Sequence, residues 1–374
     1  MLRRIIVCLL AAGLLACGGL KEQHSDLPTI SPHQGYPYYL VIGGGLSETL
    51  SVLRVNQGPS FKLYNDVALT GAAIHQTLVR NNTYFAMCSL SNSIAVYDFN
   101  LNVEREVSVG GGTNPIGFTM VDDRTAWVSD FVSADVRLVD LGPGVADDQR
   151  VKKIIALPDG STLPHDDGVT QSWARPNGIA LAHGRLFVAL SNLSAQYVPA
   201  GPGVLAVINP TSGAVEKMIT LSGRDAIGVT YDDARDLVWV TTAGDYVVGE
   251  GFVGNGMIEA VNPQTLAIER RIDVDGAPFE IVLASGALAY LGNGMDARVP
   301  VVDLDAGEQT DAVDLREHGE TLSFISGLAL DPDGRLYVVD FDSDQLYVLD
   351  PANEYKVIAS FTVNDGPDTL SFLM

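Results

Sequence analysis

The sequence predicts an all-β protein built from a repeated four-stranded antiparallel sheet. Short runs of alternating β-branched and apolar residues, separated by turns rich in Asp and Gly, extend along the whole body of the chain and are typical of strands. No amphipathic helix interrupts them. Hydrophobic residues make up 47% of the 374 residues and charged residues 18%, a composition that supplies a large core.

The repeat is visible when "RPNGIALAHGRLFVALSN" is set beside "FISGLALDPDGRLYVVD". A first apolar strand is followed by a tight turn, a second strand with an aromatic residue, a third strand that usually ends in Asp or Asn, and a fourth strand. Four-stranded repeats with spacings of 42 to 61 residues predict a β-propeller. The aligned first strands begin at Ala73, Pro115, Pro176, Ala226, Pro278, Ile325 and Pro367.

The two ends of the chain complete one blade between them. The C-terminal "DGPDTLSFLM" matches the first strand of a repeat, and no further strand follows it. The N-terminal body supplies three strands without a first strand before them. We therefore expect one domain, residues 37–374, with seven blades, closed by pairing the C-terminal strand with the N-terminal blade so that no sheet edge stays exposed.

These repeats resemble the YVTN-type propeller family, which is similar in appearance to NHL and WD-repeat propellers. The resemblance covers nearly all of residues 37–374 and implies a fold. Such propellers bind partners, serve as scaffolds or catalyse reactions, so the resemblance does not assign a function.

The N-terminus predicts export and a lipid anchor. "MLRRIIVCLLAAGLLAC" has a basic start and a short apolar core, as in a signal peptide, and "LLAC" resembles the bacterial lipobox. The resemblance implies that residues 1–16 are removed and that Cys17 is lipidated, with residues 17–36 as a flexible tether. Gly18 then favours the outer membrane or cell surface over other parts of the envelope. Ordinary secretory cleavage nearby is the alternative.

Charge and cysteine content narrow the range of partners. The formal net charge is −23, and loss of two arginines with the signal peptide makes it −25 for the mature chain. Such a surface repels nucleic acid and favours cationic partners or divalent cations. Cys88 lies in the apolar run "YFAMCSL", so we expect a buried, inert thiol and no disulfide framework.

Three motifs have structural interpretations. Trp127 and Trp239 occupy the aromatic position of the second strand, which predicts packing between blades. "GEGFVG" matches a dinucleotide fingerprint but is expected in a β-hairpin loop, without the helix that the fingerprint needs. "DFDSD", from Asp340 to Asp344, is expected to be a turn whose side chains bind local backbone; a calcium site is the alternative.

Asn177 lies in a "PNG" segment that resembles one in six-bladed lactonases of the gluconolactonase/regucalcin type. The resemblance implies that Asn177 binds a catalytic divalent cation, such as calcium, at the mouth of the channel. The early glutamate of that family is absent, and Glu280, Asp225 and His75 are the remaining candidates near equivalent positions. A metal-dependent hydrolase, with His165 or a carboxylate as base, is therefore the alternative function.

Departures from the repeat carry the main functional prediction. Three insertions, residues 158–178, 191–203 and 241–256, lie in neighbouring blades and are expected to emerge on one face. We expect a ligand or protein partner to bind there, on a monomeric, non-enzymatic, membrane-tethered binding or scaffold module. Purely decorative loops are the alternative. The expected ligand-binding residues are His165, Trp173, Arg175, Asn177, Tyr197 and Tyr246.

Overall fold

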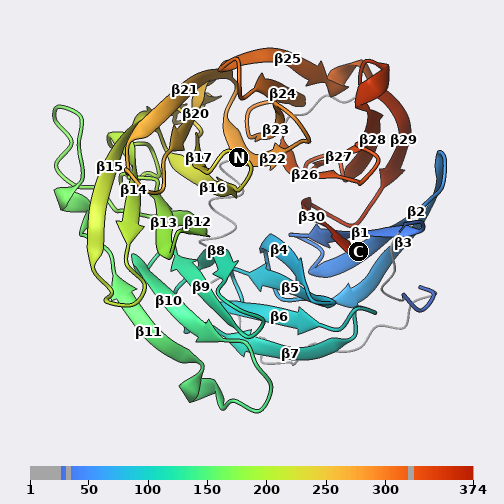
Figure 1. Cartoon of the computed structure of the whole chain (residues 1–374), viewed down its shortest axis with the longest axis horizontal. Coiled ribbons are helices and arrows are strands. Elements are labelled where there is room, and N and C mark those ends of the chain that lie inside the picture. Colours follow the sequence, from blue (N-terminus) through green and yellow to red (C-terminus); the bar gives the residue numbers. More distant parts are fainter. Residues whose placement is uncertain (1–26, 31–34, 319–323, 374) are drawn as a thin grey trace. The chain divides into compact units, whose positions relative to one another are not determined.

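The computed structural model describes residues 27–30, 35–318 and 324–373 (Figure 1). The predicted signal peptide and Cys17 lie outside these residues. Strands dominate the described part, where the helical segments are four short 3-10 helices, so the all-β prediction is confirmed. No helix in this part is long and apolar enough to span a membrane. The chain forms two compact units: unit 1 is Met1–Pro115, Leu141–Arg150 and Ile325–Met374, and unit 2 is Ile116–Asp140 and Val151–Phe324.

Unit 1 contains three groups of four antiparallel strands, namely two four-stranded sheets and the run β26 to β29, whose strands pair in chain order. In one sheet the order is β3-β2-β1-β30, and in the other two the strands follow chain order. Two 3-10 helices, η1 (Asp147–Gln149) and η4 (Pro351–Asn353), lie in its connections. The strands are β1 (Tyr38–Gly44), β2 (Thr49–Asn56), β3 (Ser60–Leu69), β4 (Ile74–Arg80), β5 (Thr83–Cys88), β6 (Ser93–Tyr97), β7 (Val103–Ser108), β26 (Ile325–Leu330), β27 (Leu336–Asp340), β28 (Gln345–Asp350), β29 (Lys356–Thr362) and β30 (Pro367–Leu373).

The C-terminal strand pairs with the N-terminal strands as predicted. β30 is antiparallel to β1, with Phe372 opposite Leu40 and Leu370 opposite Ile42. All four side chains are buried in one apolar cluster. β30 is therefore a core strand of unit 1, although it is separated from β1 by almost the whole chain. One detail of the alignment was wrong, since the second repeat's first strand begins at Ile74, not at Ala73.

Unit 2 contains three four-stranded sheets, a further run of four paired strands, β22 to β25, and one short ribbon; within each group the strands pair in chain order. Two 3-10 helices, η2 (Gly160–Thr162) and η3 (Leu315–His318), lie between strands. The strands are β8 (Pro115–Met120), β9 (Thr125–Asp130), β10 (Asp135–Asp140), β11 (Val151–Ala156), β12 (Pro176–Ala182), β13 (Arg185–Leu190), β14 (Pro202–Ile208), β15 (Val215–Arg224), β16 (Ala226–Asp232), β17 (Leu237–Thr242), β18 (Tyr246–Val247), β19 (Gly251–Phe252), β20 (Asn255–Val261), β21 (Ile268–Asp275), β22 (Pro278–Leu283), β23 (Leu288–Asn293), β24 (Arg298–Asp303) and β25 (Glu308–Asp314).

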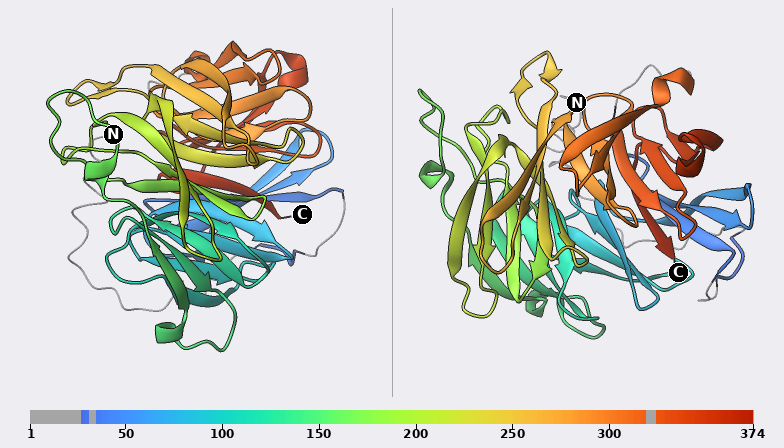
Figure 2. Two further views of the ribbon diagram at one scale, coloured as in Figure 1. Left: turned by 60° about the vertical axis from the view of Figure 1, so that its left-hand side comes forward. Right: turned by 45° about the horizontal axis from the view of Figure 1, so that its top comes forward.

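The "GEGFVG" segment belongs to the ribbon formed by β18 and β19. These two strands pair antiparallel, Tyr246 with Phe252 and Val247 with Gly251. Figure 2 shows this hairpin standing away from the four-stranded sheet that it interrupts. The segment is a β-hairpin loop, as predicted, and no helix N-terminus follows it to receive a phosphate.

Glycine in the first strand of a repeat lets neighbouring sheets of unit 2 approach each other. A Cβ atom built on Gly178 would lie 2.5 Å from the carbonyl oxygen of Ile227, and one built on Gly228 would lie 2.4 Å from that of Phe279. No side chain fits at such distances. The glycine of "RPNG" is therefore required by packing between sheets. The same requirement explains why a glycine recurs at this place in "PIG", "AIG" and "ISG".

A hydroxyl near the end of the second strand bonds each sheet of unit 2 to the next. The side chain of Ser191 donates to the carbonyl oxygen of Ala226 at 2.8 Å, and that of Thr241 donates to the carbonyl oxygen of Phe279 at 2.8 Å. Ser129 donates in the same way to the carbonyl of Asn177. These buried bonds satisfy backbone groups that the sheets leave unpaired.

Large aromatic side chains fill the space between successive sheets, as predicted. Trp239 is fully buried against Ile281 and Leu291 of the next sheet. Trp127 is buried with Ile179 and Leu190. Burying an apolar side chain of this size contributes about 3 kcal/mol, so these tryptophans are packing residues.

Two further predictions on unit 1 are confirmed. Cys88 is fully buried, and burial raises the pKa of its thiol to about 11, which keeps it protonated and unreactive. In "DFDSD", the Asp340 carboxylate accepts hydrogen bonds from the backbone N–H groups of Asp342 and Ser343, and Asp344 accepts one from Gly366. This segment is a turn with local bonds.

Candidate functional site

All three insertions belong to unit 2. Residues 158–178 connect β11 to β12 and contain η2, residues 191–203 connect β13 to β14, and residues 241–256 connect β17 to β20 and contain the β18–β19 hairpin. They are called here the first, second and third insertions.

The first two insertions are bonded to each other along their backbones. Trp173 and Leu193 form an antiparallel bridge, with N–H to carbonyl distances of 2.8 and 3.0 Å. The N–H of Asp166 donates to the carbonyl oxygen of Ala200 at 2.9 Å. Because backbone bonds of this kind fix the geometry of both segments, the two insertions form one structured surface.

Asn192 is the centre of this structure. Its side chain is fully buried. The Nδ2 atom donates to the carbonyl oxygens of Pro164 at 2.7 Å and Pro202 at 2.9 Å, and Oδ1 accepts from the Ser172 hydroxyl at 2.8 Å. An amide is required here because the site needs two donors and one acceptor on one side chain.

Arg224 joins the third insertion to the other two. Its Nη2 lies 2.5 Å from Oδ2 of Asp166 in the first insertion and 3.2 Å from the carbonyl oxygen of Pro199 in the second. Its Nε lies 2.8 Å from Oδ1 of Asp245 in the third insertion. The guanidinium also lowers the pKa of Asp166. The three insertions are therefore neighbours in space, as the sequence predicted.

Arg175 lies among three aromatic side chains. Its guanidinium carbon is 5.1 Å from the ring centroid of Phe131, 5.1 Å from that of Tyr197 and 5.7 Å from that of Trp173. The Phe131 and Tyr197 rings are nearly parallel, with an interplanar angle of 7°. Three of the predicted ligand-binding residues thus form one group, the Arg175 cluster, which consists of Phe131, Trp173, Arg175 and Tyr197.

His165 lies outside the Arg175 cluster, next to Ser172, which is bonded to Asn192. Its Nε2 is 2.7 Å from the Ser172 hydroxyl, which in turn faces the carbonyl oxygen of Gly160 at 3.0 Å and Oδ1 of Asn192. Nε2 of His165 and the Ser172 hydroxyl therefore belong to one hydrogen-bonded network with these two groups. Ser172 is buried, and the pair is a structural bond, not a nucleophile with its base.

Tyr246 belongs to a different aromatic group. Only 9% of it is exposed, and its ring packs edge-on against Phe252 at 5.2 Å. Phe252 contacts Phe279, and Phe279 contacts Phe324. Among the contacts of the described residues, none joins Tyr246 to Arg175. Tyr246 therefore anchors the hairpin, and a direct role beside Trp173 does not follow from its position.

The metal-binding residues expected by resemblance do not form a cluster. In residues 27–30, 35–318 and 324–373, no three His, Cys, Asp or Glu side chains converge on a point that would hold a metal ion. Asn177 is the second residue of β12, Asp225 precedes β16, and Glu280 is the third residue of β22. His75 belongs to unit 1, where its Nδ1 lies 3.7 Å from Oδ2 of Asp368.

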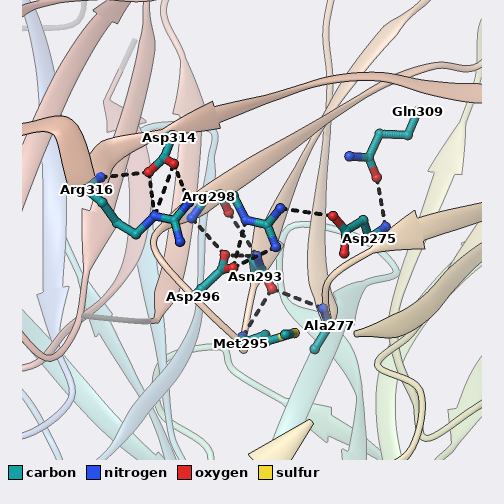
Figure 3. Close-up of polar contacts among 9 residues, drawn as sticks. All are labelled: Asp275, Ala277, Asn293, Met295, Asp296, Arg298, Gln309, Asp314 and Arg316. Atoms are coloured by element: carbon teal, nitrogen blue, oxygen red, sulfur yellow. Dashed lines mark hydrogen bonds and ion pairs between the residues drawn. The ribbon is translucent and has the colours of Figure 1, made fainter. Parts of the chain in front are cut away.

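A second polar network lies next to the third insertion (Figure 3). Arg298 forms ion pairs with Asp275 at 2.9 Å and with Asp296 at 2.7 Å. Asn293 donates to Asp296 at 2.8 Å, and Gln309 accepts from the N–H of Asp275 at 2.9 Å. Because every carboxylate here has a cationic or N–H partner, this network fixes the end of the sheet.

A cleft of about 700 Å³ opens beside this network. Its lining includes Asn255 of the third insertion and four carboxylates, Asp273, Asp275, Glu308 and Asp311. The cleft is polar and contains no aromatic side chain, in contrast to most small-molecule sites. It therefore ranks below the Arg175 cluster as a candidate site.

Sequence reasoning missed Phe131, Asn192 and Arg224. Asn192 and Phe131 each follow the second strand of a repeat, where polar turn residues are expected. The aromatic side chain at position 131 departs from this pattern, and this departure could have identified Phe131 as a candidate site residue. No sequence signal identifies Arg224, because its partners are about 20 to 60 residues away in both directions.

Asp225, which directly precedes β16, has a pKa that is strongly shifted by its surroundings. Burial raises its pKa to about 7, and the nearby Ser191 hydroxyl partly opposes this shift. Its backbone is in the left-handed region, with φ of 56°, a conformation that Asp tolerates better than most residues. A carboxyl group with a pKa near neutrality is able to accept or release a proton under physiological conditions.

Asp225→Asn is expected to flatten the pH dependence of stability. Between about pH 4 and pH 7 the folded chain holds a proton that the unfolded chain releases, so the free energy of unfolding falls as pH rises through this window. The variant has no such proton and should exceed the wild type by about 1–3 kcal/mol at pH 8. Urea denaturation from pH 4 to pH 8 measures this. Asp233→Asn, at an exposed carboxylate, is the control, and equal slopes for wild type and Asp225→Asn would contradict the assignment.

Comparison with known proteins supports the fold. No family model matches the chain, and no curated protein matches it. A protein from Bacteroides fragilis NCTC 9343 assigned as a 6-phosphogluconolactonase has a TM-score of 0.67 at 12% identity, covering 92% of this chain and 100% of its own. Virginiamycin B lyase from Staphylococcus aureus gives 0.59 at 11% identity, covering 80% and 91%. A dihydro-haem d1 dehydrogenase in complex with DHE gives 0.57 at 16% identity, covering 94% and 79%. This likeness shows a β-propeller fold, and at these identities nothing further.

Proposed function

We propose that this chain is a lipid-tethered β-propeller of the bacterial envelope that binds a ligand on the face formed by its three insertions. In this proposal residues 37–374 form seven blades in one ring, closed by the pairing of β30 with β1. The three groups of four paired strands in unit 1 and the four such groups in unit 2 support the blade number. The pairing of the terminal strands supports the closure.

The main observation in favour of a binding role is that hydrogen bonds and ion pairs hold together the surface formed by the three insertions. This surface is called here the insertion face. Loops that only connect strands need no buried polar network. Here Asn192 and Arg224 hold three insertions against each other, and half-buried Trp173 and Tyr197 surround Arg175. Aromatic side chains and an arginine on a rigid support are typical of recognition sites.

A thermal-shift screen of small metabolites against the mature chain tests the binding role. We expect compounds that raise the melting temperature of the wild type but not of the double variant Trp173→Ala/Tyr197→Ala. Tyr231→Ala is the control, since Tyr231 bonds to Asp236 at the turn between β16 and β17. Equal shifts in wild type and double variant for every stabilising compound would contradict a site on this face.

Cys17→Ser is expected to release the protein from membranes. The acyl chains on a lipidated cysteine contribute about 0.8 kcal/mol for each buried methylene group, and the variant would carry none. Membrane fractionation and intact mass of the mature protein measure the loss. A variant that stays in the membrane fraction with an unchanged mass would show that Cys17 is not the anchor.

A metal-dependent hydrolase remains the second candidate function, because Asp225 has a pKa of about 7 and thus suits a general base. The named activities of two structural neighbours, a 6-phosphogluconolactonase and a lyase, are compatible with it. Elemental analysis of the purified protein, with lactone hydrolysis assays before and after chelation, tests this candidate. Stoichiometric calcium and activity lost on chelation would favour it over a binding module.

A further inference from the structure

We propose that Arg175 is the anion-binding residue of the insertion face, and that it takes the carboxylate or phosphate group of a small ligand with a planar or apolar body. This inference rests on the proposed binding role and specifies the ligand class.

Arg175 is a buried cation without a carboxylate partner. Only 9% of the residue is exposed, and no carboxylate of the described residues lies within ion-pair distance of it. Its Nε has no hydrogen-bond acceptor, and Nη1 makes one long bond of 3.4 Å to the carbonyl oxygen of Phe131. A buried charge is costly unless it is paired and hydrogen-bonded.

Other arginines of unit 2 differ in this respect. The chain has twice as many acidic as basic residues. Four arginines of unit 2 whose side chains are mostly buried each form ion pairs with two carboxylates. These are Arg137 with Asp130 and Asp135, Arg224 with Asp166 and Asp245, Arg235 with Asp232 and Asp305, and Arg298 with Asp275 and Asp296. Arg270 also has no carboxylate partner among the described residues, but its Nη1 donates to the carbonyl oxygens of Leu304 and Asp305. Arg175 differs from all of these, because it has neither a carboxylate nor a short bond to a carbonyl oxygen.

The aromatic surroundings explain how the charge is tolerated and what it still lacks. Phe131, Trp173 and Tyr197 contact the guanidinium through their rings, which stabilises a cation. Rings do not replace the acceptors that its in-plane N–H groups require. A planar carboxylate or a phosphate accepts two such bonds side by side, and the aromatic side chains would contact the body of the same ligand.

The backbone of Arg175 adds a second cost. Its φ is 51°, in the left-handed region. The matching positions before β8 and β16 hold Asn114 and Asp225, with φ of 52° and 56°, and Asn and Asp adopt this region most readily among residues with a side chain. An arginine that is both strained and unpaired indicates a functional constraint.

Binding of a matched set of probes to the full mature chain tests the inference. Fluorine NMR titrations use 4-fluorobenzoate and 4-fluorophenyl phosphate as anions and 4-fluorobenzamide as the neutral analogue. We expect at least one anion to bind saturably and more tightly than the amide. Arg175→Met, which keeps length and loses charge, should weaken the anions by about 10- to 100-fold and leave the amide unchanged. Arg185→Met, whose partner Glu216 is on β15, is the control.

The stability of the unliganded variant is a second readout. If Arg175 is kept for binding, Arg175→Met should melt at the same temperature as the wild type or a few degrees higher, because an unpaired buried charge is removed. If the arginine only holds the aromatic side chains together, the variant should melt lower. A lower melting temperature together with unchanged anion affinity would overturn the inference.

The outcomes separate this inference from the proposed function. Stabilising compounds that depend on Trp173 and Tyr197 but carry no acidic group would preserve the binding role and overturn the anion assignment. Failure of both anions to bind the wild type would also overturn the assignment. Anions that bind equally to wild type and Arg175→Met would show a site elsewhere on the chain.

Discussion

Deletion of residues 366–374 is expected to unfold unit 1 rather than to loosen one end of the chain. The deletion removes β30, and with it the buried side chains of Leu370, Phe372 and Leu373. Each buried apolar side chain contributes about 1.5–3 kcal/mol, so the three together contribute about 5–9 kcal/mol, and β1 also loses its ladder partner. Thermal unfolding followed by circular dichroism measures the change. A truncated chain that melts with the full-length protein would contradict a core role for β30.

Addition of the missing strand in trans provides the matched control. A synthetic peptide of residues 366–374 should restore part of the lost melting temperature, because an extended peptide pairs with an exposed strand edge. The same peptide with Phe372→Asp should not, since the side chain opposite Leu40 faces the buried cluster. Equal rescue by both peptides would show that backbone pairing alone stabilises this edge.

Asn192→Asp is expected to destabilise the insertion face by about 3–5 kcal/mol at pH 7. The new carboxylate would place an acceptor against the carbonyl oxygens of Pro164 and Pro202, where the amide now donates. The backbone is not a confounding factor, because Asn192 has φ of 56° and Asp tolerates this region as Asn does. Urea denaturation gives the change in free energy, and hydrogen exchange of residues 191–203 shows where protection is lost.

Asn209→Asp is the matched control for this substitution. Oδ1 of Asn209 accepts from the N–H groups of Thr211 and Ser212 in an exposed turn, and a carboxylate accepts equally well. The substitution loses only the exposed bond from Nδ2 to Glu216 at 3.1 Å, so its effect should stay within about 1 kcal/mol. Equal effects of the two substitutions would mean that the hydrogen bonds of Asn192 do not support the insertions.

The ligand-binding residues expected from the sequence divide into two groups in the structure. Trp173, Arg175 and Tyr197 meet in one cluster. Tyr246 packs instead against Phe252, because the third insertion folds into a hairpin with an apolar face of its own. The sequence shows an aromatic side chain in this loop, but it does not show which buried surface the side chain of a loop residue will contact.

The repeat, and through it the strand order of each sheet, could be predicted from the order of the amino acids alone. The features that predict the repeat are local ones, so they can be recognised in the sequence. They are the alternation of apolar residues, the turn residues at fixed places and the small residue in each first strand. The match of "DGPDTLSF" to internal first strands predicted even the distant pairing of β30 with β1. The contacts among side chains of the insertions could not be predicted in this way. Arg224 finds Asp166 and Asp245, and Arg175 finds Phe131 rather than a carboxylate, because such contacts depend on how loops from separate sheets fold over one another, and no periodicity encodes that.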